Sequence, residues 1–192
     1  GIATAWTDST PLLAFTGQQP LDHLGKGAFQ ELDHVTLFRP VTKWSARLSE
    51  PQRTLDTLKE AYEMATWGRP GPVHIDLPVD VQTQPLSHKD LESIKFWSPT
   101  SSAHKPSGEH NAIKKAAKLL AESSRPIVIA GGGVHYSARC WKELRALAER
   151  LEAPVTTTFN GRGSFPEDHR LSAGRMGIHT RTYNDKLLAE AD

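Results

Sequence analysis

The sequence has little that would place it at a membrane, outside the cell or on nucleic acid. Its 192 residues include one cysteine, Cys140, so no disulfide can form within the chain. No apolar run approaches the roughly 20 residues that a membrane-spanning helix needs. The net charge is only +1, which gives no electrostatic reason to expect nucleic acid or an anionic membrane as a partner. We therefore expect a cytoplasmic protein, or one of an organellar stroma or matrix if the source is eukaryotic.

Metal-binding patterns are also missing. The nine histidines are scattered, and none forms a pair at helical spacing beside a carboxylate, so we predict no metal site within this sequence. The chain opens at Gly1 without a methionine, and it closes at Asp192 after a helix-like segment with no strand following. These ends lead us to expect a fragment that lacks both ends of a longer protein.

Apolar periodicity predicts an α/β fold in two parallel-sheet units. Helical patterns alternate with short apolar runs, and this alternation is typical of parallel strands with helices packed on them. The predicted strands cover residues 11–16, 43–48, 73–77, 126–130 and 154–159. The predicted helices cover residues 51–67, 109–123, 138–152 and 183–191. A stretch rich in proline and serine separates the units, so the predicted domains are residues 1–83 and 108–192, with a linker over 84–107.

The segment from Gly68 to Gln82 is the most informative motif. Gly68 can end a helix with a positive φ, and Pro70 and Pro72 then forbid helix before a short strand. Arg69 is held between the helix end and the strand. Its guanidinium can donate two hydrogen bonds to a phosphate or another ligand oxygen, or it can cap helix carbonyls, and the motif alone leaves both open. Within the following strand, Asp76 is predicted to be a structural hydrogen-bonding residue.

Three glycines, Gly131, Gly132 and Gly133, follow the predicted strand at 126–130. Without Cβ atoms the backbone can approach a ligand closely, and a helix start favours phosphate. The same residues can also form a plain strand-to-helix turn, so the pattern by itself is compatible with either role.

The Gly68–Gln82 segment resembles the end of the pyrimidine-binding domain of thiamine-diphosphate enzymes, above all acetolactate synthase large subunits. Residues 25–31 (Gly-Lys-Gly-Ala-Phe-Gln-Glu), 39–43 (Arg-Pro-Val-Thr-Lys), 156–166 and 174–179 resemble further segments of the same family. The resemblance covers nearly the whole chain. It implies the later part of a pyrimidine-binding domain, followed by the first part of a Rossmann-like central domain.

The resemblance also implies site residues. Phe29 and Gln30 would reach the active site, where Phe29 offers an apolar wall and Gln30 can orient a keto acid. Lys43 would attract an anionic 2-keto acid. Flavin-binding members hold FAD with residues that correspond here to Arg69, Gly131, Gly132, Gly133, Thr158, Phe159, Asn160, Met176, Ile178 and His179. Structural loops are the alternative interpretation of these last segments.

The implied function is a transferase or lyase that condenses two 2-keto acids, such as pyruvate, with loss of carbon dioxide, in branched-chain amino-acid biosynthesis. Thiamine diphosphate and Mg²⁺ would be bound mainly by parts that this chain lacks, and FAD would be structural. We therefore expect the chain alone to be inactive. The family implies a homodimer or homotetramer, with a regulatory subunit as a further partner. Alternatives are another thiamine-diphosphate enzyme (a decarboxylase, oxidase or C–C hydrolase), or a non-catalytic nucleotide-binding α/β module.

Overall fold

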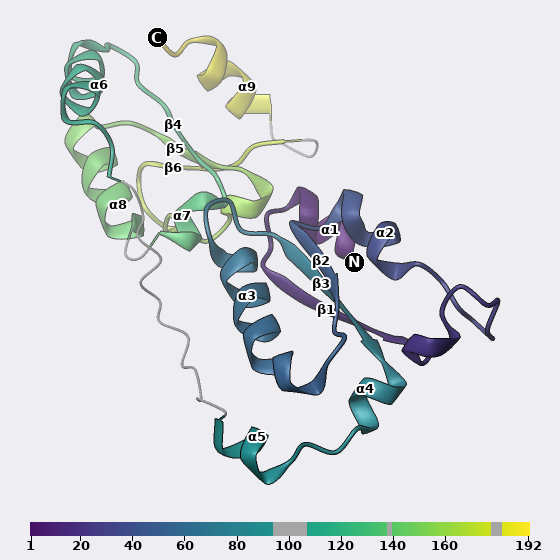
Figure 1. The fold of residues 1–192 in the computed structure, drawn as a ribbon. Helices are drawn as coiled ribbons and strands as arrows, with labels where there is room; N and C mark the ends of the chain where they lie inside the picture. The colour runs from purple at the N-terminus through teal and green to yellow at the C-terminus, as the bar shows by residue number, and fades with distance from the viewer. Residues whose placement is uncertain (94–106, 138–139, 178–181) are drawn as a thin grey trace. The chain divides into compact units, whose positions relative to one another are not determined.

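The computed structural model describes residues 1–93, 107–137, 140–177 and 182–192 (Figure 1). The chain divides into two compact units, Gly1–Pro106 (unit 1) and Ser107–Asp192 (unit 2). Each unit contains a three-stranded parallel sheet with helices, so the predicted α/β fold class is confirmed.

Unit 1 is built on a parallel sheet with the strand order β1-β3-β2. Its strands are β1 (Leu12–Gln18), β2 (Trp44–Arg47) and β3 (Pro72–Pro78). Its α-helices are α1 (Ile2–Thr7), α2 (His34–Phe38), α3 (Thr54–Thr66), α4 (Val79–Thr83) and α5 (His88–Ser93). Short 3₁₀ turns lie at Leu21–His23, Arg39–Val41 and Pro51–Arg53. The predicted strands and the long helix are found, whereas α2, α4 and α5 are too short to give a periodic signal.

The two faces of this sheet differ in chemistry because successive residues of a strand point to opposite sides. One face is apolar and packs against α3 (Figure 1). The buried side chains of this core, from the sheet, from α3 and from α4, are Leu48, Ala61, Ala65, Val73, Ile75 and Val81. The other face carries His74 and Asp76, which are fully buried beside α2. Burial of polar groups on this second face requires hydrogen-bond partners, and these define the site described below.

Unit 2 repeats the parallel arrangement with the strand order β4-β5-β6. Its strands are β4 (Val128–Ala130), β5 (Val155–Thr157) and β6 (Ser172–Arg175). Its helices are α6 (His110–Glu122), α7 (Gly133–Tyr136), α8 (Cys140–Leu151) and α9 (Thr182–Ala189), with a 3₁₀ turn η4 at Phe159–Gly161. Strand β6 was not predicted, because Ser-Ala-Gly-Arg offers neither an apolar run nor a clear alternation.

The helices of unit 2 are buried to different degrees. Leu144 and Ala148 of α8 lie in the core with Val155, whereas the apolar face predicted for α6 is largely open. Ile113 is 54% and Leu119 is 70% exposed. Over the described ranges, none of the helices combines the length and apolar character needed to cross a bilayer.

Candidate functional site

A pocket of about 470 Å³ lies at the carboxyl ends of β1 and β3, and we call it the edge pocket. Ligands of open parallel sheets commonly bind outside this edge. The pocket is lined by residues of β1, the loop after it, the start of α2, and α4. These residues are Gly17, Gln18, Gln19, Gln30, His34, Val79 and Gln82. Gln30, one of the predicted active-site residues, is therefore placed beside a cavity.

The loop that carries Phe29 and Gln30 is held by Glu31. Its carboxylate accepts hydrogen bonds from the backbone N–H groups of Gly25 (2.5 Å) and Ala28 (3.0 Å). These bonds favour the ionised form, so the pKa of Glu31 lies below its ordinary value. The loop presents the Phe29 ring to solvent, at 80% exposure, and gives Gln30 a left-handed backbone with φ of 57°. A positive φ at a residue other than glycine is a strained geometry that often accompanies functional loops.

Lys43 lies at the opposite edge of the sheet, because it precedes the first residue of β2. Its ammonium donates to the backbone carbonyl of Trp67 at the end of α3, at 2.5 Å. Partial burial lowers its pKa. The structure thus joins Lys43 to a helix C-terminus and does not bring it together with Gln30.

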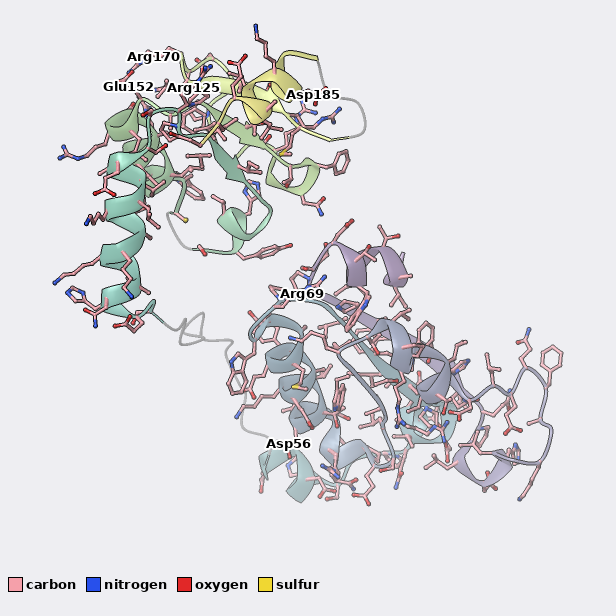
Figure 2. The ribbon with its side chains drawn as sticks, turned by 90° about the horizontal axis from the view of Figure 1, so that it is seen from above. Asp56, Arg69, Arg125, Glu152, Arg170 and Asp185 are labelled. Atoms are coloured by element: carbon pink, nitrogen blue, oxygen red, sulfur yellow. The ribbon has the colours of Figure 1, made fainter. Side chains whose placement is uncertain are left out.

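Arg69 also lies on the amino side of β3, in the turn before the strand (Figure 2). Its guanidinium donates to Ser9 Oγ (2.6 Å) and to the carbonyls of Trp6 and Thr7 (both 3.2 Å). It therefore binds the C-terminal end of α1, rather than the end of the helix that precedes Gly68. Contact with a cofactor stays a prediction for this residue.

Asp76, on β3, is the common acceptor of a buried cluster that sequence reasoning missed. Its side chain has no exposed surface. It accepts hydrogen bonds from Thr16 (2.8 Å), Gln18 (3.3 Å), His34 (2.8 Å) and Arg47 (2.8 Å). Burial opposes its ionisation, but the bonds from Arg47, His34, Thr16 and Gln18 outweigh burial and hold its pKa below the ordinary value. We call these five residues the Asp76 cluster.

His74 extends this polar layer across the sheet. Its ring nitrogens lie 2.8 Å from the hydroxyls of Thr16 and Ser45, and its ring packs against Phe38 with centroids 4.4 Å apart. Burial lowers its pKa, which favours a neutral ring. Since Thr16 donates its proton to Asp76, a neutral ring donates to Thr16 from Nε2, while Ser45 Oγ lies within hydrogen-bond distance of both His74 Nδ1 (2.8 Å) and the Val35 carbonyl (3.2 Å). His74 is therefore occupied on both nitrogens.

A sequence signal for this layer does exist. In all three strands the polar residues recur at every second position, with Thr16 and Gln18 in β1, Ser45 and Arg47 in β2, and His74 and Asp76 in β3. Such an alternation predicts one polar face for each strand. Only the register places these polar faces beside one another, because Thr16 and Arg47 both align with Asp76.

In unit 2, the glycine turn packs against the loop after β5. The Thr158 N–H donates to the carbonyl of Ala130 at 2.9 Å. A Cβ on Gly132 would lie 3.0 Å from Asn160 Cβ, and one on Gly161 would lie only 2.1 Å from the Ala130 oxygen. Absence of a side chain at these two glycines therefore permits two loops to meet at the carboxyl edge of the sheet.

Several of the predicted cofactor residues gather at this edge. Phe159 is 76% exposed, and the guanidinium of Arg175 lies 5.7 Å from its ring centroid. Met176 follows β6, and its N–H donates to the carbonyl of Thr157 at 2.9 Å. With Gly131, Gly132, Gly133, Thr158 and Asn160, these residues form one edge of unit 2. The predicted contacts Ile178 and His179 lie outside the described residues.

The residues present offer little to a divalent cation. Within the described ranges, no three His, Cys, Asp or Glu side chains come together as a metal site. Mg²⁺ prefers several oxygen ligands, including carboxylates, and no carboxylate lines the edge pocket. The described part of the chain therefore does not fit a bound Mg²⁺ diphosphate, and we derive no chemical step through that group.

Both units are parallel α/β sheets, and ligands of such sheets commonly bind outside the carboxyl ends of the strands, where unit 1 has the edge pocket. Comparison with known proteins identifies the family. Residues 113–192 match the model described as the thiamine pyrophosphate enzyme, central domain. The whole chain is 46% identical, over 195 residues, to a probable acetolactate synthase large subunit of Methanocaldococcus jannaschii. It is 38% identical to the acetolactate synthase large subunit of Lactococcus lactis and 37% identical to the isozyme 3 large subunit of Escherichia coli, again over its full length.

The chain belongs to the thiamine-diphosphate enzyme family, in the part of it that contains the acetolactate synthase large subunits. The chain spans about a third of the length of the curated relatives it matches: 32% for the archaeal protein and 33% for the two bacterial ones.

Proposed function

We propose that this chain is the part of an acetolactate synthase that links the pyrimidine-binding and central domains. In the proposed reaction one pyruvate loses its carboxylate as carbon dioxide, and the remaining two-carbon unit forms a C–C bond to the keto carbon of a second 2-keto acid. This is transferase and lyase chemistry that would serve branched-chain amino-acid biosynthesis. The observation that carries the proposal is the 46% identity over the full chain to a probable acetolactate synthase large subunit.

The chemistry of the residues at the edge pocket also supports this proposal. Gln30 lines the cavity, and its side-chain amide makes no hydrogen bond among the described residues. An amide can both donate and accept, as the carboxylate and carbonyl of a 2-keto acid require. Phe29, next to it, offers an exposed apolar ring for the substrate's alkyl group or for a second subunit. Thiamine diphosphate with Mg²⁺ would supply the carbanion chemistry from parts of the enzyme outside this chain.

The proposal includes assembly and location. We infer a homodimer or homotetramer in the cytoplasm or an organellar compartment, with a regulatory subunit as a further partner. The relatives are named large subunits, which implies that those proteins have a smaller partner. We propose no nucleic-acid partner, because the net charge of +1 gives no electrostatic reason to expect one.

The function is tested with pyruvate, thiamine diphosphate and Mg²⁺. A full-length enzyme that contains this chain is expected to release one carbon dioxide for each acetolactate formed, whereas the 192-residue chain alone forms none. The expectation rests on the metal-ligand cluster that the described residues lack. Acetolactate is measured after acid conversion to acetoin, and carbon dioxide is measured by trapping. Decarboxylation to acetaldehyde without acetolactate would instead favour a decarboxylase. Acetolactate formed by the chain alone would contradict the proposal that parts of the enzyme outside this chain bind the cofactor.

A flavin is proposed at the carboxyl edge of unit 2, where Phe159 offers an exposed ring and Arg175 a cation. The full-length enzyme is then expected to be yellow, with an absorbance band near roughly 450 nm that is typical of flavins. Replacing Phe159 with alanine should weaken FAD retention about tenfold, since an aromatic contact contributes on the order of 1 kcal/mol. The matched control is Trp141→Ala, which removes another half-exposed aromatic side chain of this unit. Colourless protein that gains no flavin on incubation with FAD would argue against the cofactor.

A further inference from the structure

His34 combines a buried ionic partner with access to the edge pocket. It begins α2, lines the pocket, and keeps 16% of its side chain exposed. Its Nδ1 lies 2.8 Å from Asp76 Oδ1. An ionised carboxylate only accepts, so Nδ1 carries the proton and donates it to Asp76. The same residue thus offers one occupied and one unoccupied nitrogen.

The second nitrogen, Nε2, is the unoccupied one. The contact between Nδ1 and the Gln18 amide is 3.3 Å, but that amide already directs its hydrogens to the Leu32 carbonyl (2.7 Å) and to Asp76. Among the described residues, no hydrogen bond is made to Nε2. A carboxylate that fixes one nitrogen of a histidine and leaves the other for a ligand is the arrangement found in acid–base sites.

The charges around the ring balance one another. Among the described residues, the charged or titratable groups in contact with His34 are Asp76 and His74 on β3; Arg47 on β2 pairs with Asp76, and Asp33 precedes His34 at the start of α2. Asp76 pairs with Arg47 at 2.8 Å and its pKa is lowered, which favours the carboxylate, while burial lowers the pKa of His74 and favours a neutral ring. Asp33 is exposed and caps α2 through the N–H of Thr36. Among the described residues that line the pocket, no fixed positive charge is present to attract an anion.

His34 is the residue that can change the net charge of the pocket. Of the residues that line it, His34 is the only one that can become positively charged. The amides of Gln19 and Gln82 already donate, to Phe29 O and Leu77 O, both at 2.7 Å. An anion placed among neutral amides would be poorly compensated, whereas an imidazolium would pair with it.

We propose that the edge pocket binds the carboxylate of a small 2-keto acid, and that His34 takes up a proton at Nε2 as the ligand binds. Nε2–H then donates to the ligand, with the Gln30 amide as a second donor, while Asp76 keeps the ring oriented. The ligand class rests on the proposed function. The role of His34 follows from its place between Asp76 and the cavity.

The test measures pyruvate binding to the full chain by calorimetry between pH 5.5 and 8. Since one proton is taken up for each ligand, the affinity of the wild-type chain is expected to fall as the pH rises from 5.5 to 8, by up to about tenfold per pH unit. His34→Asn is the key variant, because its amide can replace Nδ1–H toward Asp76 but has no counterpart of Nε2. It should bind pyruvate about tenfold more weakly at pH 6 and without pH dependence.

Two further measurements keep the outcome decisive. His23→Asn, an exposed histidine outside the pocket, is the matched control and should behave as wild type. In the wild-type chain, the ¹⁵N signal of His34 Nε2 should move into the protonated range when pyruvate is added at pH 7, which tests the idea even if His34→Asn fails to fold. An unmoved signal, or an unchanged pH dependence in His34→Asn, would overturn the role of His34. No pyruvate binding by the wild-type chain would overturn the site, and missing acetolactate from the full-length enzyme would overturn only the proposed function.

Discussion

Replacement of Asp76 with alanine is expected to destabilise unit 1 by about 3 kcal/mol, the lower end of the cost of removing one partner from a buried ion pair. The variant leaves Arg47 without its carboxylate and removes the acceptor from Thr16, Gln18 and His34 at once. Urea unfolding followed by tryptophan fluorescence measures the loss. The matched control is Asp22→Ala, whose side chain is 78% exposed and whose effect should stay within about 0.5 kcal/mol.

The stabilising contribution of Asp76 should depend on pH in a defined direction. Because the folded-state pKa of Asp76 is lowered, its stabilising contribution is fully present above the unfolded-state pKa, near 3.8, and is lost as the pH falls through the lower folded-state value. The difference in unfolding free energy between wild type and Asp76→Ala should therefore be constant from pH 7 to about pH 5 and shrink below about pH 4. A difference that grows on acidification would show that Asp76 is not ionised in the folded chain.

Replacement of Gly161 with alanine is expected to disrupt unit 2. The new Cβ would lie 2.1 Å from the Ala130 oxygen and 3.0 Å from the Gly131 carbonyl carbon, and these backbone atoms cannot move without separating β4 from the loop after β5. Overpacking usually costs 1–3 kcal/mol, and a backbone clash this close is expected to cost about 3 kcal/mol or more. Thermal unfolding of the chain, with circular dichroism for residual structure, measures the effect.

Gly133→Ala is the matched control for this variant. A Cβ at Gly133 meets nothing within 4 Å, and the residue begins α7, where alanine is the better helix former. The control should be neutral or stabilise the chain by up to about 1 kcal/mol. If Gly161→Ala unfolded at the same temperature as Gly133→Ala, the close approach of the two loops would be wrong. Gly133→Ala also separates roles, because a loss of FAD binding without a loss of stability would indicate direct contact with the cofactor.

The structure places the predicted site residues Gln30 and Lys43 at opposite ends of the strands of unit 1. The motif predicted that Gln30 lies in an active-site loop, and the structure places Gln30 in the lining of the edge pocket. Lys43 was grouped with it because both fall in family-like segments, yet Lys43 precedes its strand and binds the end of α3. Sequence proximity does not reveal which edge of a sheet a residue reaches, since that depends on where the strand begins and in which direction it runs.

Glycine patterns were predictive of turns but not of their purpose. Gly131, Gly132 and Gly133 were expected at the end of a strand, where they indeed lie. The structure adds that the close approach at Gly132 is to Asn160, from a loop nearly thirty residues later. Gly161, which was not singled out, has the tightest surroundings of the glycines whose contacts the structure describes. Such an approach depends on two strands lying side by side and has no local sequence signature.

By itself, the sequence determined that this chain forms two parallel α/β units, because apolar periodicity and turn residues act over short stretches of chain. It also indicated the family, through local motifs such as Gly68 to Gln82. Only the tertiary structure decided that Asp76 is the common acceptor for Thr16, sixty residues earlier, and Arg47, twenty-nine residues earlier. The physical reason is register: parallel pairing in the order β1-β3-β2 places these residues level on one face of the sheet, where a buried charge must find its partners.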